Sequence, residues 1–309
     1  MPPFCRILWY TNGFGISEVV PAPATRELCM RRRRRRASRL PKLATPVRLS
    51  VIVPVFNEAE TVVEALTAVL GVQIPGVELE VIVVESNSSD DSRQRVRGFA
   101  SDPRVELVLQ DRPRGKGNAV REGLRHVTGD VILIQDADLE YSVDDYPRLI
   151  EPIVSGTTDF VLGCRHVPGQ PIRVMDGAAR TSRILNVAHW IFTGLFDVVY
   201  GVRLRDPFTM YKVFRSACLD GVRLTSDRFD FDWELVGKLV RSGYLPVEVP
   251  VAYAARSFAR GKKIRFFRDP PTWIAACIRF RFARLREHPT RTDRGSPRPD
   301  QDDAVGAGR

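Results

Sequence analysis

The clearest candidate for chemistry in this sequence is a pair of carboxylates that follows an apolar run. Asp136 and Asp138 stand one residue apart at the end of Val131–Gln135. They would repel each other unless a cation joined them, and alternate residues leaving a strand point the same way. Hard oxygen ligands favour Mg²⁺ or Mn²⁺, and such an ion commonly bridges phosphates. The pair therefore predicts a metal site that serves a diphosphate leaving group.

Two more polar clusters follow apolar runs elsewhere in the chain. One is Pro54–Glu58, with the sequence PVFNE, and the other is Glu85–Asp91, with the sequence ESNSSDD. In a parallel sheet such clusters meet at the carboxyl edge, where ligands bind. The second cluster has an equally good alternative interpretation as a helix cap, since Asn, Asp and Ser favour that position. This alternative is weaker for the cluster that runs from Asp136 to Glu140.

Five apolar, β-branched segments bounded by polar turns predict the strands that must hold these clusters. They are Leu49–Pro54, Leu79–Val84, Val105–Leu109, Val131–Gln135 and Phe160–Gly163. Apolar residues at helical spacing lie between them, at Val62, Val63, Leu66, Val69 and Leu70 and again at Val120, Leu124 and Val127. The alternation predicts an α/β protein with a mostly parallel, Rossmann-like sheet that helices cover on both faces.

Other common nucleotide-binding and metal-binding signatures are missing from the sequence. The segment 114–119, RGKGNA, lacks the spacing and the Lys-Ser/Thr ending of a P-loop, and no GxGxxG follows the first strand. The five cysteines include no CxxC pair, which argues against a zinc site or a disulfide framework. Such cysteine usage is typical of a reducing, cytoplasmic compartment.

The formal charge of +10 is concentrated at the ends of the chain. Residues 1–49 carry +9 and residues 279–309 carry +3, whereas residues 50–278 carry −2. We expect 1–48, with six consecutive arginines, and 287–309 to be disordered tails. Nucleic-acid binding is therefore the weakest hypothesis, because the basic residues lie outside the predicted folded domain. Contact with anionic lipid is an alternative role for the arginines.

The sequence predicts a peripheral association with a membrane. No uninterrupted apolar run reaches the roughly 18–20 residues that a membrane-spanning helix needs. The segment 269–286 mixes apolar and aromatic residues with arginine. It is interpreted either as a helix docked on the core or as a helix in the membrane interface, with Ile184–Tyr200 as a second amphipathic segment. The expected location is the cytoplasmic, inner face of the membrane.

Five motifs, in their order along the chain, resemble glycosyltransferase family 2, whose members are inverting, metal-dependent enzymes of GT-A fold. They are VIVPVFNE, VIVVESNSSDDS, RGKGNAVREGL, DVILIQDADLE and DPFTMYKVFR, followed by the late segment FDFDWELVGKLVRSGYLPVEVPV. The resemblance covers about 49–268, which is the predicted catalytic domain. DADLE, the GCR at 163–165 and RSFARGKKI look most like the dolichol- or polyprenyl-phosphate sugar (mannose-type) synthases of that family.

The resemblance implies a nucleotide-sugar donor and a role for each matching residue. It implies that the donor contacts Pro54, Phe56, Asn57, Glu58, Val84, Glu85, Ser86, Lys116, Asp136, Ala137, Asp138, Arg165, Arg256 and Lys262. The ion, Mg²⁺ or Mn²⁺, would bind Asp136, Asp138 and Glu140. The segment that contains Arg256 and Lys262 would close over the phosphates. The sequence departs from the family pattern where Glu85-Ser86 replaces the usual Asp-Asp and where Thr209-Met210 replaces a frequent Thr-Gly.

The resemblance also implies a single displacement at the anomeric carbon, with a nucleoside diphosphate as leaving group. The residues expected to act in catalysis are Asp138, Arg165, Asp206 and Glu234. A polyprenyl-phosphate acceptor is already anionic and needs no strong base, whereas a saccharide or other hydroxyl acceptor needs one. The candidate bases are Asp206, Asp232 and Glu234, although Asp206 also suits a turn and Asp232 a helix cap. A protein that binds a nucleotide or lipid without catalysis is a weaker alternative.

Overall fold

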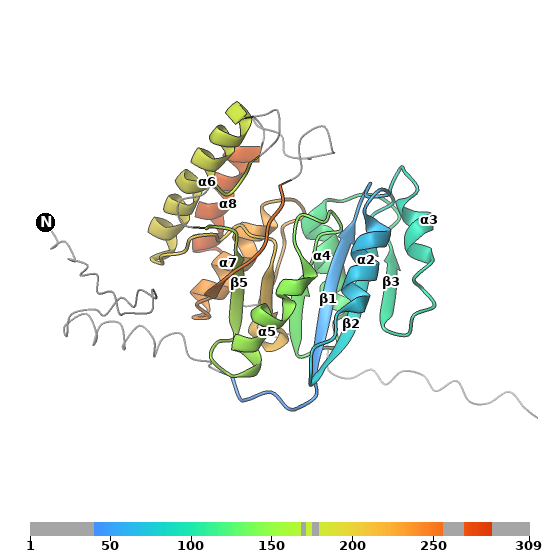
Figure 1. Cartoon of the computed structure of the whole chain (residues 1–309). Helices are drawn as coiled ribbons and strands as arrows, with labels where there is room; N and C mark the ends of the chain where they lie inside the picture. The colour runs from blue at the N-terminus through green and yellow to red at the C-terminus, as the bar shows by residue number, and fades with distance from the viewer. Residues whose placement is uncertain (1–39, 168–170, 175–178, 256–268, 286–309) are drawn as a thin grey trace, which may run out of the picture.

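A single seven-stranded sheet forms the centre of the molecule. The computed structural model describes residues 40–167, 171–174, 179–255 and 269–285. Their strands are β1 (Val47–Val55), β2 (Val77–Glu85), β3 (Val105–Leu109), β4 (Val131–Ile134), β5 (Phe160–Cys164), β6 (Lys212–Arg215) and β7 (Val247–Pro250). The strand order is β3-β2-β1-β4-β6-β5-β7 (Figure 1). β6 is antiparallel to both of its neighbours, and all other pairs are parallel.

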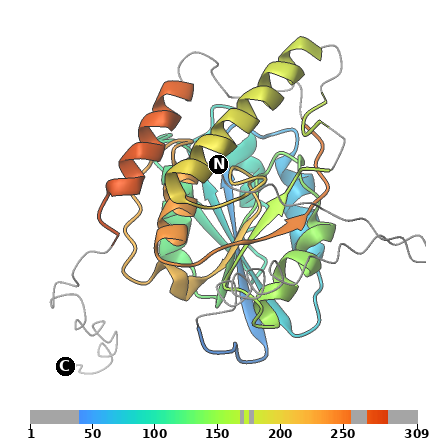
Figure 2. The same ribbon diagram turned by 90° about the vertical axis from the view of Figure 1, so that its left-hand side faces the viewer.

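Helices cover both faces of this sheet. One face packs against α2 (Val62–Gly71), α3 (Ser92–Arg97) and α5 (Tyr146–Val154). The other face packs against α4 (Lys116–His126), α6 (Ala179–Tyr200), α7 (Phe231–Arg241) and α8 (Asp269–Phe282). Short 3-10 turns, Val143–Asp145 and Ser216–Leu219, follow β4 and β6. Helices α6 and α8 lie side by side at one end of the molecule, far from α2 and α3 (Figures 1 and 2).

The alternation of side chains along β1 produces the two cores. Val51 and Val53 belong to the core under α2 and α5, whereas Ile52 belongs to the core under α4. All three side chains are fully buried, as expected for a central strand of a parallel sheet. A Cβ at Gly123 of α4 would lie 2.6 Å from a methyl group of Ile52. The missing side chain thus lets α4 lie directly on the sheet, which fixes where its first turn points.

The predicted fold class is confirmed, since all five predicted strands form and the sheet is mostly parallel. Apolar patterns identified neither β6 nor β7, although the resemblance of the late segment implied the helix and strand that form here as α7 and β7. Each of these two strands has four residues, and two residues of β6, Lys212 and Arg215, are basic, so the hydrophobic signal is weak. Both side chains are nevertheless buried, because Lys212 pairs with Asp232 and Arg215 lies 3.6 Å from Asp159.

The predicted N-terminal tail extends too far into the folded part. Residues 40–48 belong to the described structure: Leu43 packs on the core, Pro41 accepts a hydrogen bond from Arg215, and β1 begins at Val47. The remainder of that prediction, residues 1–39, and the predicted tail 287–309 lie outside the described residues. Within the described ranges, no helix combines the length and the apolar character needed to cross a bilayer.

Candidate active site

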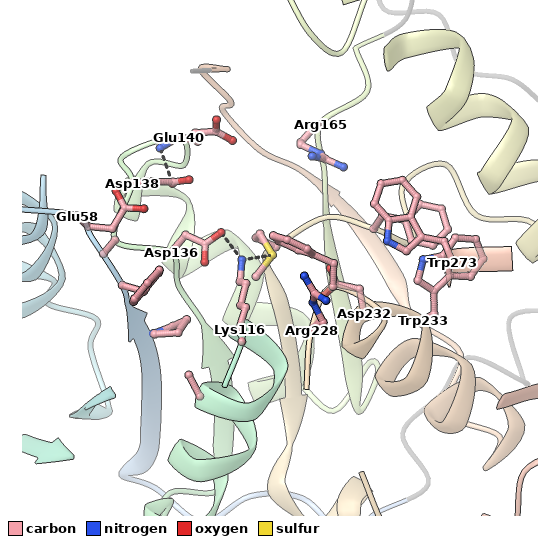
Figure 3. A pocket seen from close by; sticks show the side chains of 18 of the residues that line it. Glu58, Lys116, Asp136, Asp138, Glu140, Arg165, Arg228, Asp232, Trp233 and Trp273 are labelled. Carbon is pink, nitrogen blue, oxygen red and sulfur yellow. Dashed lines mark hydrogen bonds and ion pairs between the residues drawn. The ribbon is translucent and has the colours of Figure 1, made fainter. Parts of the chain in front are cut away.

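A cavity of about 730 Å³ lies between the carboxyl ends of the central strands and the helices α6, α7 and α8. Its residues come from the end of β1, from the segments after β1, β2, β4, β5 and β7 and before β6 and α7, from the start of α4, and from the three helices. Figure 3 shows two kinds of surface. Carboxylates line one side of the cavity, which we call the polar half, and tryptophans line the other, which we call the aromatic half.

The polar half contains the carboxylates that the sequence singled out. Glu58, Asp136, Asp138 and Glu140 all line the cavity and lie on one side of it (Figure 3). A tight turn after β4 brings the last two together: Leu139 has a φ of 59°, and the N–H of Glu140 donates to Oδ1 of Asp138 over 3.1 Å. A left-handed non-glycine residue is costly, which is typical of functional turns.

Lys116 is the cation closest to this acidic group. Its Nζ lies 2.6 Å from Oδ2 of Asp136 and 2.9 Å from Sδ of Met210. Burial opposes its positive charge, but Asp136, Asp232 and Asp138 outweigh burial and raise the pKa of Lys116. The lysine therefore stays protonated and balances the charge of Asp136.

Two glycines allow Lys116 to reach this position. Gly115 has a φ of 105°, and a Cβ there would lie 2.4 Å from the carbonyl oxygen of Asp227. A Cβ at Gly117 would lie 2.7 Å from the carbonyl oxygen of Ser226. The first turn of α4 thus sits against the loop before α7, and the glycines of RGKGNA serve close backbone packing rather than a P-loop.

The carboxylate oxygens of the polar half are ligands that a hard divalent ion prefers, but they do not converge on one point. Among the described residues, no group of three Asp, Glu, His or Cys side chains could hold a metal. Glu140 instead accepts a hydrogen bond from Tyr253 over 2.9 Å, and Asp136 pairs with Lys116. Asp136 and Asp138 therefore stay candidate ligands, and in this arrangement they would fill only part of the coordination shell of a divalent ion.

The other residues expected to bind the donor divide into two groups. Pro54, Phe56, Ser86 and Ala137 line the cavity beside the carboxylates. Asn57, Val84 and Glu85 do not. The side chain of Asn57 accepts a hydrogen bond from the N–H of Ser89, and Val84 lies in the core under α4. Asn57 thus holds its turn against the next loop, Val84 packs in the core, and neither lines the cavity.

Glu85 has a similar internal role. Its carboxylate is fully buried and accepts hydrogen bonds from the N–H groups of Asn87 and Ser88 and from the guanidinium of Arg93. These bonds hold the loop before α3 and do not cap the helix, whose N-cap residue, Asp91, makes no side-chain cap hydrogen bond. Ser86, the next residue, is the one that reaches the cavity, and its hydroxyl donates to Gln110 over 3.0 Å.

Arg165 lines the cavity at the end of β5, and Asp206 stands behind it. The guanidinium donates to both carboxylate oxygens, over 2.8 and 2.7 Å, and the Arg165 N–H donates to the same carboxylate. Asp206 has no exposed surface. Burial opposes its charge, but Arg165 outweighs burial and lowers the pKa of Asp206. The geometry makes Asp206 an anchor for Arg165, and its expected role as a general base stays a prediction.

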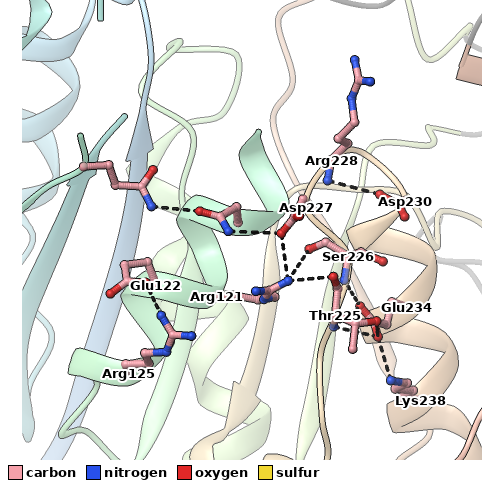
Figure 4. A network of polar contacts seen from close by, with 12 residues as sticks. Arg121, Glu122, Arg125, Thr225, Ser226, Asp227, Arg228, Asp230, Glu234 and Lys238 are labelled. Carbon is pink, nitrogen blue, oxygen red and sulfur yellow. Dashed lines mark hydrogen bonds and ion pairs between the residues drawn. The ribbon is translucent and has the colours of Figure 1, made fainter. Parts of the chain in front are cut away.

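Glu234, the second of the three candidate bases, does not line the cavity. Its carboxylate accepts hydrogen bonds from Lys238, from the hydroxyl and N–H of Thr225 and from the N–H of Ser226 (Figure 4). The side chain is fully buried. The network ties α7 to the loop that also receives Arg121 of α4 through Asp227. This position differs from the expected one, and its contacts serve the loop.

Asp232 is the one candidate base that lines the cavity. It lies on the first turn of α7, and its Oδ1 is 2.7 Å from Nζ of Lys212. Lys212 is fully buried, and burial lowers its pKa. The remaining expected contacts, Arg256 and Lys262, lie outside the described residues.

Sequence reasoning missed most of the aromatic half. Its lining includes Leu185, Ala188, His189 and Phe192 of α6, Phe208, Trp233 of α7 and Trp273 of α8. The rings make contact with one another. Phe192 packs edge-on against Trp233 and Trp273, and the ring centroids of Phe208 and Trp233 are 4.2 Å apart. The only sequence signal was the apolar composition of Ile184–Tyr200 and of 269–286.

Three arginines also border the cavity, of which the sequence had indicated Arg165 alone. Arg228 precedes α7 and lies near Lys116 and Asp232 (Figure 3). Arg173 precedes α6. Neither belongs to a recognisable motif, so spacing along the chain could not have identified them.

Comparison with known proteins identifies the family. The model of glycosyl transferase family 2 matches residues 50–208. The chain belongs to this family. A dolichol-phosphate mannosyltransferase of Pyrococcus furiosus is 28% identical over 225 residues, which are 70% of this chain and 58% of that protein. An undecaprenyl-phosphate 4-deoxy-4-formamido-L-arabinose transferase of an Enterobacter species is also 28% identical, over 70% of this chain and 62% of that protein.

The family assigned by sequence motifs is thus confirmed, while the match to individual relatives is partial. The chain spans about three fifths of the length of these two proteins. Among solved structures, the fold is similar to mannosyl-3-phosphoglycerate synthase from Rubrobacter xylanophilus, with a TM-score of 0.54, 17% identity and coverage of 76% of this chain and 73% of that one. Glucosyl-3-phosphoglycerate synthase from Mycobacterium tuberculosis gives a TM-score of 0.53 at 18% identity, over 79% and 86% of the two chains.

Proposed function

We propose that this protein is an inverting glycosyltransferase that moves a sugar from a nucleotide-sugar donor to a polyprenyl-phosphate acceptor. The observation that carries the proposal is the continuity of the two halves of the cavity. Asp136, Asp138 and Lys116 suit a diphosphate, and Trp233 and Trp273 suit a hydrocarbon chain. The two named relatives act on polyprenyl phosphates, which supports the same acceptor class here.

In this reaction an oxygen of the acceptor phosphate attacks the anomeric carbon of the donor. The bond from that carbon to the diphosphate oxygen breaks, and its electron pair leaves with the nucleoside diphosphate. Lys116 and Arg228 are positioned to stabilise the negative charge that develops there, and such preorganised charges are usually a large catalytic term. Asp136 and Asp138 would hold Mg²⁺ or Mn²⁺. A bound ion would neutralise charge on the diphosphate.

The acceptor itself removes the need for a general base. A phosphate acceptor is deprotonated at neutral pH, so no proton has to be transferred when the new bond forms. This agrees with the positions of Asp206 and Glu234, whose carboxylates are occupied by Arg165 and by Lys238 with its neighbours. A saccharide acceptor is a second candidate, and Asp232 is the carboxylate in reach for it. Replacement of Asp232 by Asn would abolish transfer to a hydroxyl and leave transfer to a phosphate.

We also propose that α6 and α8 contact the membrane surface. Their outward residues include Ile184, Val187, Ile191 and Val198 of α6 and Ile274, Ile278 and Phe282 of α8, all substantially exposed. Their spacing places each set along one helix face. Exposed Arg183, Arg279 and Arg281 flank these residues. An apolar stripe with adjacent arginines suits an interface with anionic lipid, beside the aromatic half where the acceptor chain would enter.

The proposal is tested by a donor screen with Mg²⁺ or Mn²⁺. Release of nucleoside diphosphate is measured for each nucleotide sugar, with and without a polyprenyl phosphate in mixed micelles. We expect one donor class to give release that depends on the lipid phosphate and yields a glycosylated lipid. Release that depends on a saccharide instead would favour the second candidate, and no release with any donor would contradict both.

A further inference from the structure

A buried glutamine stands directly before the carboxylates of the polar half, at the end of a wholly apolar strand. Gln135 follows β4, whose four side chains are all buried, and is itself 2% exposed. Its N–H donates to the carbonyl of Ile52 over 3.0 Å, so the residue continues the sheet. Burial of an amide is costly unless its polar atoms all have partners, and an apolar side chain would avoid that cost.

The amide of Gln135 finds these partners in and around the turn that follows it. Its Nε2 donates to the carbonyl oxygen of Asp136 over 2.9 Å. Its Oε1 accepts hydrogen bonds from the hydroxyls of Tyr146, over 2.9 Å, and Tyr211, over 2.8 Å. The opposite orientation of the amide would set Oε1 against a carbonyl oxygen. The contacts therefore hold the side chain in one orientation.

Tyr211 connects Gln135 to the far end of the same turn. Its hydroxyl lies 2.8 Å from Oε1 of Gln135 and 2.7 Å from the carbonyl oxygen of Ser142, and the two acceptors share its single hydrogen. Burial raises the pKa of Tyr211, so the hydroxyl stays protonated and can donate. A continuous series of three contacts thus joins the carbonyl of Asp136 to that of Ser142. We call Gln135 and Tyr211 the clasp.

The segment that the clasp closes contains carboxylates of the polar half. Asp136, Asp138 and Glu140 lie between its two ends and line one side of the cavity (Figure 3). Asp138 accepts a hydrogen bond from the N–H of Glu140, and Leu139 between them has a left-handed backbone. Such a backbone is unfavourable for a residue other than glycine and persists where surrounding contacts hold it. The clasp supplies contacts of this kind at both ends of the turn.

The position of Tyr211 is set by the sheet and not by the turn alone. Its side chain has no exposed surface. Its carbonyl accepts a hydrogen bond from the N–H of Gly163 in β5 over 2.8 Å, and a Cβ at Gly163 would lie 2.7 Å from the Cβ of Tyr211. Its ring packs on that of Tyr141, with 4.6 Å between the centroids. The clasp therefore transmits a fixed position from β5 to the turn.

We propose that Gln135 and Tyr211 are positioning residues, which fix the directions of Asp136 and Asp138 in the cavity. This rests on the proposed function, in which those carboxylates serve the diphosphate of the donor. Neither clasp residue lines the cavity, so both act through the turn and not on the substrate. Charged groups at a leaving group are effective when their geometry is set before the reaction, and supporting hydrogen bonds provide that geometry.

The test compares Tyr211→Phe with Tyr146→Phe on the full chain. Each variant loses one buried hydroxyl that contacts Gln135, but only the hydroxyl of Tyr211 also reaches Ser142. Both should lower the midpoint of chemical denaturation by similar amounts. Tyr211→Phe alone should speed hydrogen exchange of the amides in 136–142 by about 10-fold, because the turn then opens more readily. Gln135→Met, which keeps the length of the side chain, should act as Tyr211→Phe does.

Binding and turnover separate a positioning role from a contribution to stability. The binding probes are GDP and UDP, each with Mn²⁺, and Kd values come from calorimetry. Tyr211→Phe should weaken the tighter of the two and lower kcat, each by about 10-fold, since small misplacements of reacting groups are costly. KM for citronellyl phosphate, a short and soluble acceptor, should stay unchanged. Tyr146→Phe should leave all of these values unchanged.

The exchange measurement does not depend on the proposed function. Faster exchange of the turn in Tyr211→Phe and Gln135→Met, in a protein that transfers no sugar to any acceptor, would support the clasp and reject the function. Transfer and exchange that are equal in Tyr211→Phe and Tyr146→Phe would overturn the positioning role and leave the function standing. If Gln135→Met does not fold, the two tyrosine variants decide.

Discussion

The two halves of the cavity are built on different principles. In the polar half, the side chains follow strands of the central sheet, and each is held by a specific partner, as Asp136 is by Lys116 and Asp138 by the N–H of Glu140. In the aromatic half, the side chains come from three helices and hold one another by ring contacts, as Phe192 does with Trp233 and Trp273. Charge placement demands defined geometry, whereas an apolar wall tolerates variation.

This difference predicts how the halves respond to mutation. A change in the polar half should affect the reaction rate strongly, because it alters the charge that meets the leaving group. A change in the aromatic half should affect acceptor affinity moderately, because apolar contacts contribute in proportion to area. The following five predictions test this contrast, in order of decreasing effect.

The largest effect is expected for Asp138→Asn. This change keeps the shape of the side chain and removes a charge from the expected ion site, so kcat should fall about 10³-fold. Thermal stabilisation by Mn²⁺ should disappear with it. Asp144→Asn, in the turn at the start of α5, is the matched control. An Asp138→Asn protein that retains both turnover and its response to Mn²⁺ would remove the polar half from catalysis.

The second effect concerns stability. It tests whether Glu234, which does not line the cavity, serves the fold and not catalysis. Glu234→Gln should lower the free energy of unfolding at pH 7 by about 3 kcal/mol, because Lys238 loses its buried partner. Turnover per folded molecule should stay unchanged. Chemical denaturation and kcat are the measurements, with Glu122→Gln on α4 as control. A stable but inactive Glu234→Gln enzyme would instead restore the base hypothesis.

The same residue predicts a dependence of stability on pH. Burial opposes the charge of Glu234, but hydrogen bonds from Lys238, Ser226 and Thr225 outweigh burial and lower its pKa below the ordinary 4.5. The folded state therefore binds the proton more weakly than the unfolded state. The stabilisation is present above about pH 4.5 and is lost as the pH falls through the lowered pKa. Glu234→Gln should remove this part of the acid-induced loss of stability.

A smaller effect is expected in the aromatic half. Trp273→Ala should raise KM for farnesyl phosphate about 10-fold and leave kcat and KM for the donor nearly unchanged, since it removes apolar contact area alone. The effect should shrink with citronellyl phosphate, which has a shorter chain. Phe282→Ala, whose ring is 79% exposed, serves as control in detergent. Equal losses for both chain lengths would argue against a hydrocarbon site.

The smallest effect is expected outside the cavity, on the exposed face of α6. Val198→Glu, at a side chain 83% exposed, should weaken binding to anionic vesicles roughly 5-fold, because it replaces apolar contact by a like charge. Transfer to soluble citronellyl phosphate should not change. Val63→Glu on α2, at the other face of the sheet, is the control. Vesicle co-sedimentation that is equal for both variants would contradict the membrane surface.

The sequence predicted the polar half much better than the aromatic half. Asp136 and Asp138 follow a strand whose pattern is unambiguous, so their position needed only the geometry of a parallel sheet. Trp233 and Trp273 are 40 residues apart on helices whose packing no local pattern specifies. The same limit applies to Glu234. The family resemblance implied a catalytic carboxylate at this position of the sequence, but no local pattern specifies where its side chain points. Its direction depends on Thr225 and Lys238.

The pairing of Lys116 with Asp136 has a further consequence for the order of events. The ammonium group already occupies the position beside Oδ2 that an incoming cation would take. A divalent ion that bound to this oxygen would displace the ammonium group, and the lysine would then need another anion as its partner. A diphosphate supplies that anion and further metal ligands together. Cation and nucleotide should thus load as one unit, and the pocket stays electrically balanced before and after the exchange.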